Sequence, residues 1–151
     1  SAIHSATKLL FQGTDIIDVE ERVSTASDFW NEVDGAISEW GLVRAGRLTS
    51  GEIRQDYIHS HGVVLSALGR VGNKLLKDGT KKWKQKFAAM SELDWLRSNT
   101  ALWEGRAMRN GRISKSNDNV TLTANVIKTQ LSIPLSPEEQ LLEDDYTQGD
   151  Q

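Results

Sequence analysis

The residues best suited to chemistry lie in one polar segment, residues 103–119. Its two glycines, three arginines, one lysine, two serines and three asparagines offer mostly hydrogen-bond donors. Contacts with a phosphate backbone need such donors together with flexible cations. We interpret Asn119 as the N-cap of a following helix, residues 120–131, whose start adds partial positive charge beside the segment. The segment therefore predicts an anion-binding loop.

A second group of cations precedes this loop in a predicted amphipathic helix, residues 81–93. If both groups contact DNA, the contacting residues are Lys81, Lys82, Lys84, Lys86, Arg106, Arg109, Arg112, Ser114, Lys115 and Asn119. Two alternatives remain open. The lysines are then simply solvated, and the loop arginines are internal struts that pair with Glu104, Asp94 or Asp118 around an ordinary turn at residues 110–111.

Enzymatic chemistry has little support in the sequence. The histidines are His4, His59 and His61, and the pair at i and i+2 points to different faces of a helix, where local hydrogen bonds explain it better than a metal. Adjacent carboxylates lie in polar surroundings, and no phosphate-binding loop, zinc-protease or nucleophile-elbow motif occurs. We therefore predict no catalytic residue, no cofactor and no metal site. A nuclease or nucleotide hydrolase is the remaining enzymatic alternative.

Composition sets the wider limits. The chain has 151 residues, enough for one domain, with five tryptophans and no cysteine, so disulfides and thiolate metal sites are excluded. No apolar stretch approaches the roughly 18 residues that span a bilayer. The net charge of −3 is unevenly spread: residues 1–43 carry −6, residues 44–128 carry +9 and residues 129–151 carry −6. Both cationic groups lie in the positive middle part.

Helical periodicity and glycine-marked turns predict an all-α fold, a single irregular helical bundle in which a Gly/Arg-rich loop precedes a capped helix. The helical domain is expected over residues 1–143, followed by an acidic, disordered tail at residues 144–151. Small residues at Gly69 and Gly72 predict close helix packing. The expected helices cover residues 3–11, a second from Ser24 or Ser27 to Gly41, residues 59–76, 81–93 and 120–131, and one beginning at Ser136-Pro137.

Two segments, residues 59–76 and 94–128, resemble the C-terminal part of the DNA sulfur modification family DndB, of the DGQHR-domain group. The resemblance covers roughly residues 55–131. The positions that carry its second segment are Trp103, Gly105, Arg106, Asn110, Gly111, Arg112, Ser114, Lys115 and Asn119.

This resemblance implies a bacterial, cytoplasmic protein of a DNA phosphorothioation system, in which sulfur replaces a non-bridging phosphate oxygen. It implies a transcriptional repressor that binds promoter DNA rather than the sulfur-transferring enzyme, and a chain that is a C-terminal fragment of a longer protein. The expected partners are double-stranded promoter DNA and the N-terminal half of the same protein, with a homo-oligomer left open and no membrane. The alternative is a helical protein-interaction or structural domain of the modification machinery that does not touch DNA.

Overall fold

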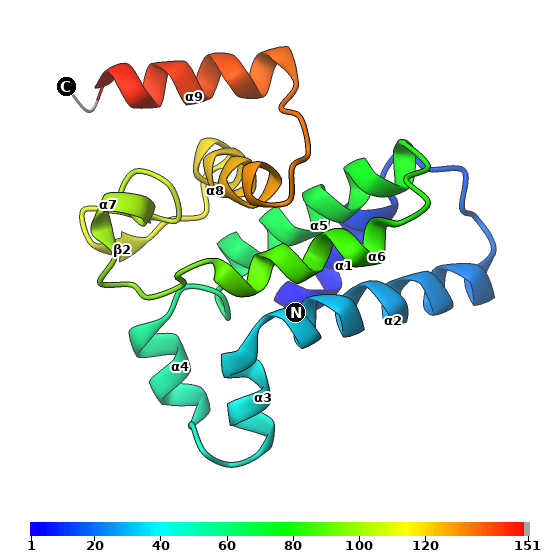
Figure 1. Ribbon diagram of the computed structural model, residues 1–151, viewed down its shortest axis with the longest axis horizontal. Helices are drawn as coiled ribbons and strands as arrows, with labels where there is room; N and C mark the ends of the chain where they lie inside the picture. Colours follow the sequence, from blue (N-terminus) through cyan, green and yellow to red (C-terminus); the bar gives the residue numbers. More distant parts are fainter. Residues whose placement is uncertain (150–151) are drawn as a thin grey trace.

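Helices dominate the computed structural model, which describes residues 1–149 (Figure 1). In chain order the elements are α1 (Ala2–Phe11), α2 (Val19–Ala36), α3 (Ser38–Arg44), α4 (Ser50–Asp56), α5 (Gly62–Lys77), α6 (Trp83–Lys86), the 3-10 helix η1 (Phe87–Glu92), α7 (Thr100–Trp103), β1 (Met108–Arg109), β2 (Arg112–Ile113), α8 (Asn117–Gln130) and α9 (Pro137–Gly149). The predicted all-α class is confirmed, with one addition, a short antiparallel hairpin formed by β1 and β2.

Helix α5 forms the centre of the fold, with α1 on one side and α8 on another (Figure 1). Most of its residues are buried, whereas its long polar side chains stay partly or fully exposed, namely those of Arg70, Asn73, Lys74 and Lys77. A methyl group on Gly69 would lie 2.5 Å from the carbonyl oxygen of Ala6, and one on Gly72 would overlap the ring of Phe29. The prediction that these glycines permit close packing is therefore confirmed.

Several helix boundaries differ from the predicted ones because capping groups lie outside the apolar pattern. Asp18 caps α2, so the predicted starts at Ser24 and Ser27 are wrong. The helix also ends before Gly41, because the backbone becomes extended at Ile37 and a separate helix, α3, follows. The helix predicted from residue 59 begins at residue 62, and the one predicted over 81–93 divides into α6 and η1.

Helix α9 replaces most of the tail that was predicted to be disordered. A capping box at Ser136 and Glu139, with bonds of 2.8 and 3.2 Å, starts the helix where the sequence predicted it. The helix then continues through residues 144–149, and its Tyr146 hydroxyl donates to the carbonyl oxygen of Glu104 at 2.8 Å. This contact joins two residues that are 42 positions apart, and it explains why residues 144–149 are helical although their composition alone did not indicate it. Residues 150 and 151 lie outside the described residues.

Stacked tryptophans anchor the start of the polar segment. Trp103 is fully buried, and its ring stacks on Trp95 with centroids 5.5 Å apart and an interplanar angle of 8°. Its indole N–H donates to the carbonyl oxygen of Asp94 at 2.7 Å, which satisfies the only polar atom of the side chain. The hairpin and α8 therefore extend from a rigid base. None of the helices within residues 1–149 is long and apolar enough to cross a membrane.

Candidate nucleic-acid interface

The centre of the predicted loop is a tight β-hairpin rather than an open turn. Asn110 and Gly111 both have positive φ, 54° and 74°, as the two central residues of a type I′ turn require. The carboxylate of Glu104 accepts the backbone N–H groups of both residues, the second at 3.2 Å. The turn amides are thus already satisfied, so any anion that binds here must be held by side chains.

Arg106 is an internal strut. Its side chain is 11 % exposed and forms a bidentate ion pair with Glu143, at 2.6 and 2.8 Å. It also donates to the carbonyl oxygen of Leu122 at 2.9 Å, and its guanidinium lies 4.3 Å from the centroid of the Tyr146 ring. Strut pairing was the alternative that the sequence left open. The carboxylate, however, comes from α9, and not from Glu104 or from the aspartates at 94 and 118.

Asn119 and Ser114 also hold the loop from within. Asn119 is 1 % exposed, donates to the carbonyl oxygen of Arg106 at 2.6 Å and accepts from the Ser114 hydroxyl at 2.8 Å. The prediction that Asn119 is the N-cap is wrong. Ser116 caps α8 and accepts the N–H of Asn119 at 3.3 Å, so the helix starts three residues earlier. The buried amide instead ties the start of α8 to the base of the hairpin.

The remaining cations of the loop point into solvent. Arg109 and Arg112 are exposed and directly opposite each other in the hairpin register, and Lys115 is exposed nearby in sequence. The amino group of Lys115 passes over the start of α5, 3.0 Å from where a side chain on Gly62 would begin. Within residues 1–149 the side chains of these three cations have no ion pair or hydrogen bond. They form the exposed cationic group of this site.

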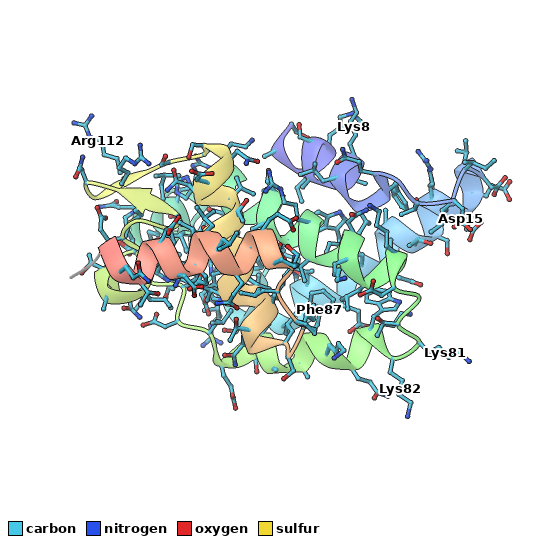
Figure 2. The ribbon with its side chains drawn as sticks, turned by 90° about the horizontal axis from the view of Figure 1, so that it is seen from above. Lys8, Asp15, Lys81, Lys82, Phe87 and Arg112 are labelled. Carbon is cyan, nitrogen blue, oxygen red and sulfur yellow. The ribbon has the colours of Figure 1, made fainter. Side chains whose placement is uncertain are left out.

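The lysines of the 81–86 segment are a separate group. Lys84 pairs with Asp28 at 3.3 Å, and its amino group lies 5.8 Å from the Trp83 ring centroid. Lys81 and Lys82 are exposed, but they lie at the opposite end of the molecule from Arg112 (Figure 2). Lys86 is partly buried and lies, like Lys84, on the short helix α6. The two predicted cationic groups therefore do not form one continuous face.

The two histidines of the pair, His59 and His61, each make an internal hydrogen bond. His59 is fully buried, its Nε2 lies 2.8 Å from a carboxylate oxygen of Glu39, and its ring stacks on Tyr57 with centroids 5.1 Å apart. Burial lowers the pKa of His59, and the carboxylate opposes this only in part. His61 makes the local bond that the sequence predicted, with the carbonyl oxygen of Arg54 at 2.9 Å, whereas the partner of His59 lies twenty residues away. A fully buried imidazole cannot reach a substrate in this arrangement.

Sequence reasoning missed the contribution of α9 to this site. Glu143 and Glu139 reach back from α9 to the two cations Arg106 and Lys128. A weak signal was present, because residues 139, 142, 143 and 146 have the spacing of one helix face and mix acidic with apolar side chains. Within residues 1–149, no group of three or more histidines or carboxylates is arranged to hold a metal ion.

Comparison with known proteins agrees with the resemblance found in the sequence. A family model, DndB, described as DNA-sulfur modification-associated, matches residues 1–134. The match extends beyond residues 55–131, so α1 to α4 are included as well. A search of curated proteins and a search of solved structures each gave no match. Since the family model covers most of the chain, including α5, the hairpin and α8, the chain belongs to the DNA-sulfur modification-associated DndB family.

Proposed function

We propose that this domain binds the phosphate backbone of double-stranded DNA through the exposed cationic group Arg109, Arg112 and Lys115. In this proposal the domain acts as a transcriptional repressor of DNA sulfur modification genes in the bacterial cytoplasm, and it is not an enzyme. The observation that supports DNA contact most strongly is the Arg109–Arg112 pair, two like charges opposite each other that form no ion pair with any carboxylate of residues 1–149.

Like charges directly across a hairpin destabilise it, so such a pair is unfavourable in the free protein. A phosphate between the two guanidinium groups would remove the repulsion and accept bidentate hydrogen bonds. The hairpin is also well suited to present them, because Glu104 holds the turn and Asn119 holds its base. The arginines therefore project from a rigid support, which lowers the conformational entropy lost on binding.

The family context supports the same partner. DndB proteins are DNA-sulfur modification-associated, so DNA is the macromolecule with which this system works. The repressor role rests on the resemblance of residues 59–76 and 94–128. A hairpin that holds phosphates without reading base edges would supply affinity and orientation, and sequence preference would come from other contacts.

The test is a binding titration of the 151-residue chain with a labelled duplex of about 20 base pairs over a series of salt concentrations. If Arg109 and Arg112 each neutralise one phosphate, R109A/R112A will reduce the slope of log affinity against log salt by about 1.8. The matched control is K81A/K82A, which removes two exposed cations at the opposite end of the molecule. An unchanged slope in R109A/R112A would refute the hairpin contact, and a loss confined to K81A/K82A would transfer it to the lysines.

A second candidate function, a protein-interaction domain, is favoured by one observation. Ile17, Val19 and Val23 at the start of α2 are 82, 73 and 64 % exposed, and the two valines are one helical turn apart. If this apolar face joins two copies of the chain, sedimentation equilibrium will show association that V19S/V23S abolishes. A chain that stays monomeric at high concentration would leave this candidate without support.

A further inference from the structure

Helix α9 has an unusual composition for a helix that packs on a protein. Within Pro137–Gly149 it carries five acidic side chains and no basic one. None of its residues is buried, and Leu141 is 65 % exposed. The residues turned toward the rest of the protein are only partly buried, and they are Glu139, Leu142, Glu143 and Tyr146. Apolar burial therefore contributes little to holding this helix in place.

Ionic contacts hold it instead. Glu143 pairs with Arg106 through two bonds, and Glu139 pairs with Lys128, whose side chain is only 6 % exposed. Asn125 of α8 adds a bond to the Glu139 carbonyl oxygen and one to the Glu143 carboxylate, both 3.2 Å long. The cations Arg106 and Lys128 thus lie beneath α9, which packs over α8 in both views (Figures 1 and 2).

One covered cation, Arg106, adjoins the exposed cationic group along the chain. Arg106 precedes the hairpin by two residues, and Arg109 and Arg112 follow in the hairpin itself. Arg70 of α5 lines the same surface depression as Lys128 and Glu139, and its side chain donates to Asn117 and Thr121 of α8. Of these cations, Arg106 and Lys128 pair with carboxylates of α9, and Arg70 lines the same depression as Glu139.

We propose that the surface formed by Arg106, Lys128 and Arg70 is a second phosphate-binding surface, and that the acidic helix α9 and the DNA backbone compete for it. The carboxylate of Glu143 stands where a phosphate would bind, because a guanidinium receives both groups through the same two-pronged geometry. This inference rests on the proposed function and extends it: α9 limits how many phosphates the domain can hold.

Competition of this kind is reciprocal. If α9 lowers the affinity for DNA, then bound DNA lowers the affinity of α9 for its site by the same factor. The first experiment therefore uses the unaltered chain and measures amide hydrogen exchange in α9 with and without a saturating DNA duplex. Exchange in α9 should become faster on DNA binding while α5 stays protected. Unchanged or slower exchange in α9 would overturn the proposal, and this readout does not depend on any variant folding correctly.

The second experiment weakens α9 in the full chain with E139Q/E143Q. The matched control is E138Q/D145N, which removes the same charge from exposed positions of the same helix. If about a tenth of the molecules have α9 released at rest, releasing it in all of them raises DNA affinity about tenfold. An equal gain in DNA affinity in both double variants would mean that the acidic side chains of α9 repel DNA in general. It would overturn the proposal that α9 covers a phosphate-binding surface.

Combining E139Q/E143Q with R109A/R112A separates this proposal from the previous one. DNA binding that depends on the hairpin arginines but ignores E139Q/E143Q refutes the cover and keeps the proposed function. Binding that is tightened by E139Q/E143Q and ignores R109A/R112A refutes the hairpin contact and keeps the cover. No DNA binding by any form refutes both. Heparin in place of DNA, tightened to the same extent, would identify the covered surface as a general polyanion site and contradict its assignment to DNA.

Discussion

Arg106 and Arg109 are three residues apart, yet they occupy opposite environments. Arg106 is enclosed by a carboxylate, a carbonyl oxygen and an aromatic ring, whereas Arg109 is exposed beside another arginine. Arg106 has a carboxylate partner, and Arg109 has none within residues 1–149. Even Glu104, whose carboxylate lies at the hairpin turn, accepts the backbone N–H groups of Asn110 and Gly111 and forms no ion pair with Arg109. The position of an arginine in a cationic segment therefore says little about its role. The role depends on whether a carboxylate pairs with its guanidinium.

The largest difference between these two sites should appear in stability. R106A removes the charged donor of the partly buried Glu143 and a donor of the Leu122 carbonyl oxygen, which should lower the free energy of unfolding by about 2–3 kcal/mol. Urea denaturation with an unchanged m-value measures this loss. R106K, which keeps the charge but loses the fork, should recover only part of it. A loss below about 0.5 kcal/mol, the range of ordinary surface substitutions, would mean that Arg106 is not a strut.

Two glycines sharpen the same comparison. Gly105, under α9, and Gly111, at the hairpin tip, both have positive φ, 83° and 74°, so alanine costs about 1–2 kcal/mol of backbone strain at either place. A methyl group on Gly105 would also lie 2.6 Å from the Tyr146 ring, whereas one on Gly111 meets nothing within 4 Å. G105A should therefore lose about 1 kcal/mol more than G111A in the same urea titration, and expose α9 to hydrogen exchange. Equal losses would show that α9 does not press on this turn.

The sequence predicted the parts of this arrangement that depend on local signals. A cationic polar segment before a helix, the Asn110-Gly111 turn and the capped start of α9 all follow from residues within a few positions of one another. The hairpin was missed because strands of two residues are too short for an alternating pattern. The position of Asn119 was misjudged because Ser116 is an equally good cap and lies earlier.

The pairing of Arg106 with Glu143 could not be predicted in the same way. The two residues are separated by 37 positions, and no periodicity links them. Acidic composition from residue 144 on suggested a disordered tail, because composition does not reveal that a cationic surface elsewhere can order an acidic helix. The burial of His59 against Glu39 was missed for the same reason.

Acid should release α9. Hydrogen bonds from Arg106 lower the pKa of Glu143 despite burial, and although burial raises the pKa of Glu139, its bonds with Lys128 and Ser136 lower it overall. Carboxylates with lowered pKa values stabilise the docked form above the ordinary value of 4.5, and this stabilisation is lost as the pH falls through the lowered values. Hydrogen exchange in α9, corrected for intrinsic rates, should rise below about pH 4.5 before global unfolding. Release that is independent of pH would contradict ionic docking.

The smallest effect, and the one of opposite sign, belongs to the hairpin. R109A removes one of two facing charges that have no counter-ion within residues 1–149, so it should stabilise the chain by a few tenths of a kcal/mol. R112A should give a similar gain, and the double variant should gain no more than either single one, because the same repulsion is removed only once. Salt at about 1 M should abolish all three gains, since exposed charges are then screened. If R109A instead destabilises the chain by about 1 kcal/mol or more, Arg109 has an internal partner, and its contrast with Arg106 disappears.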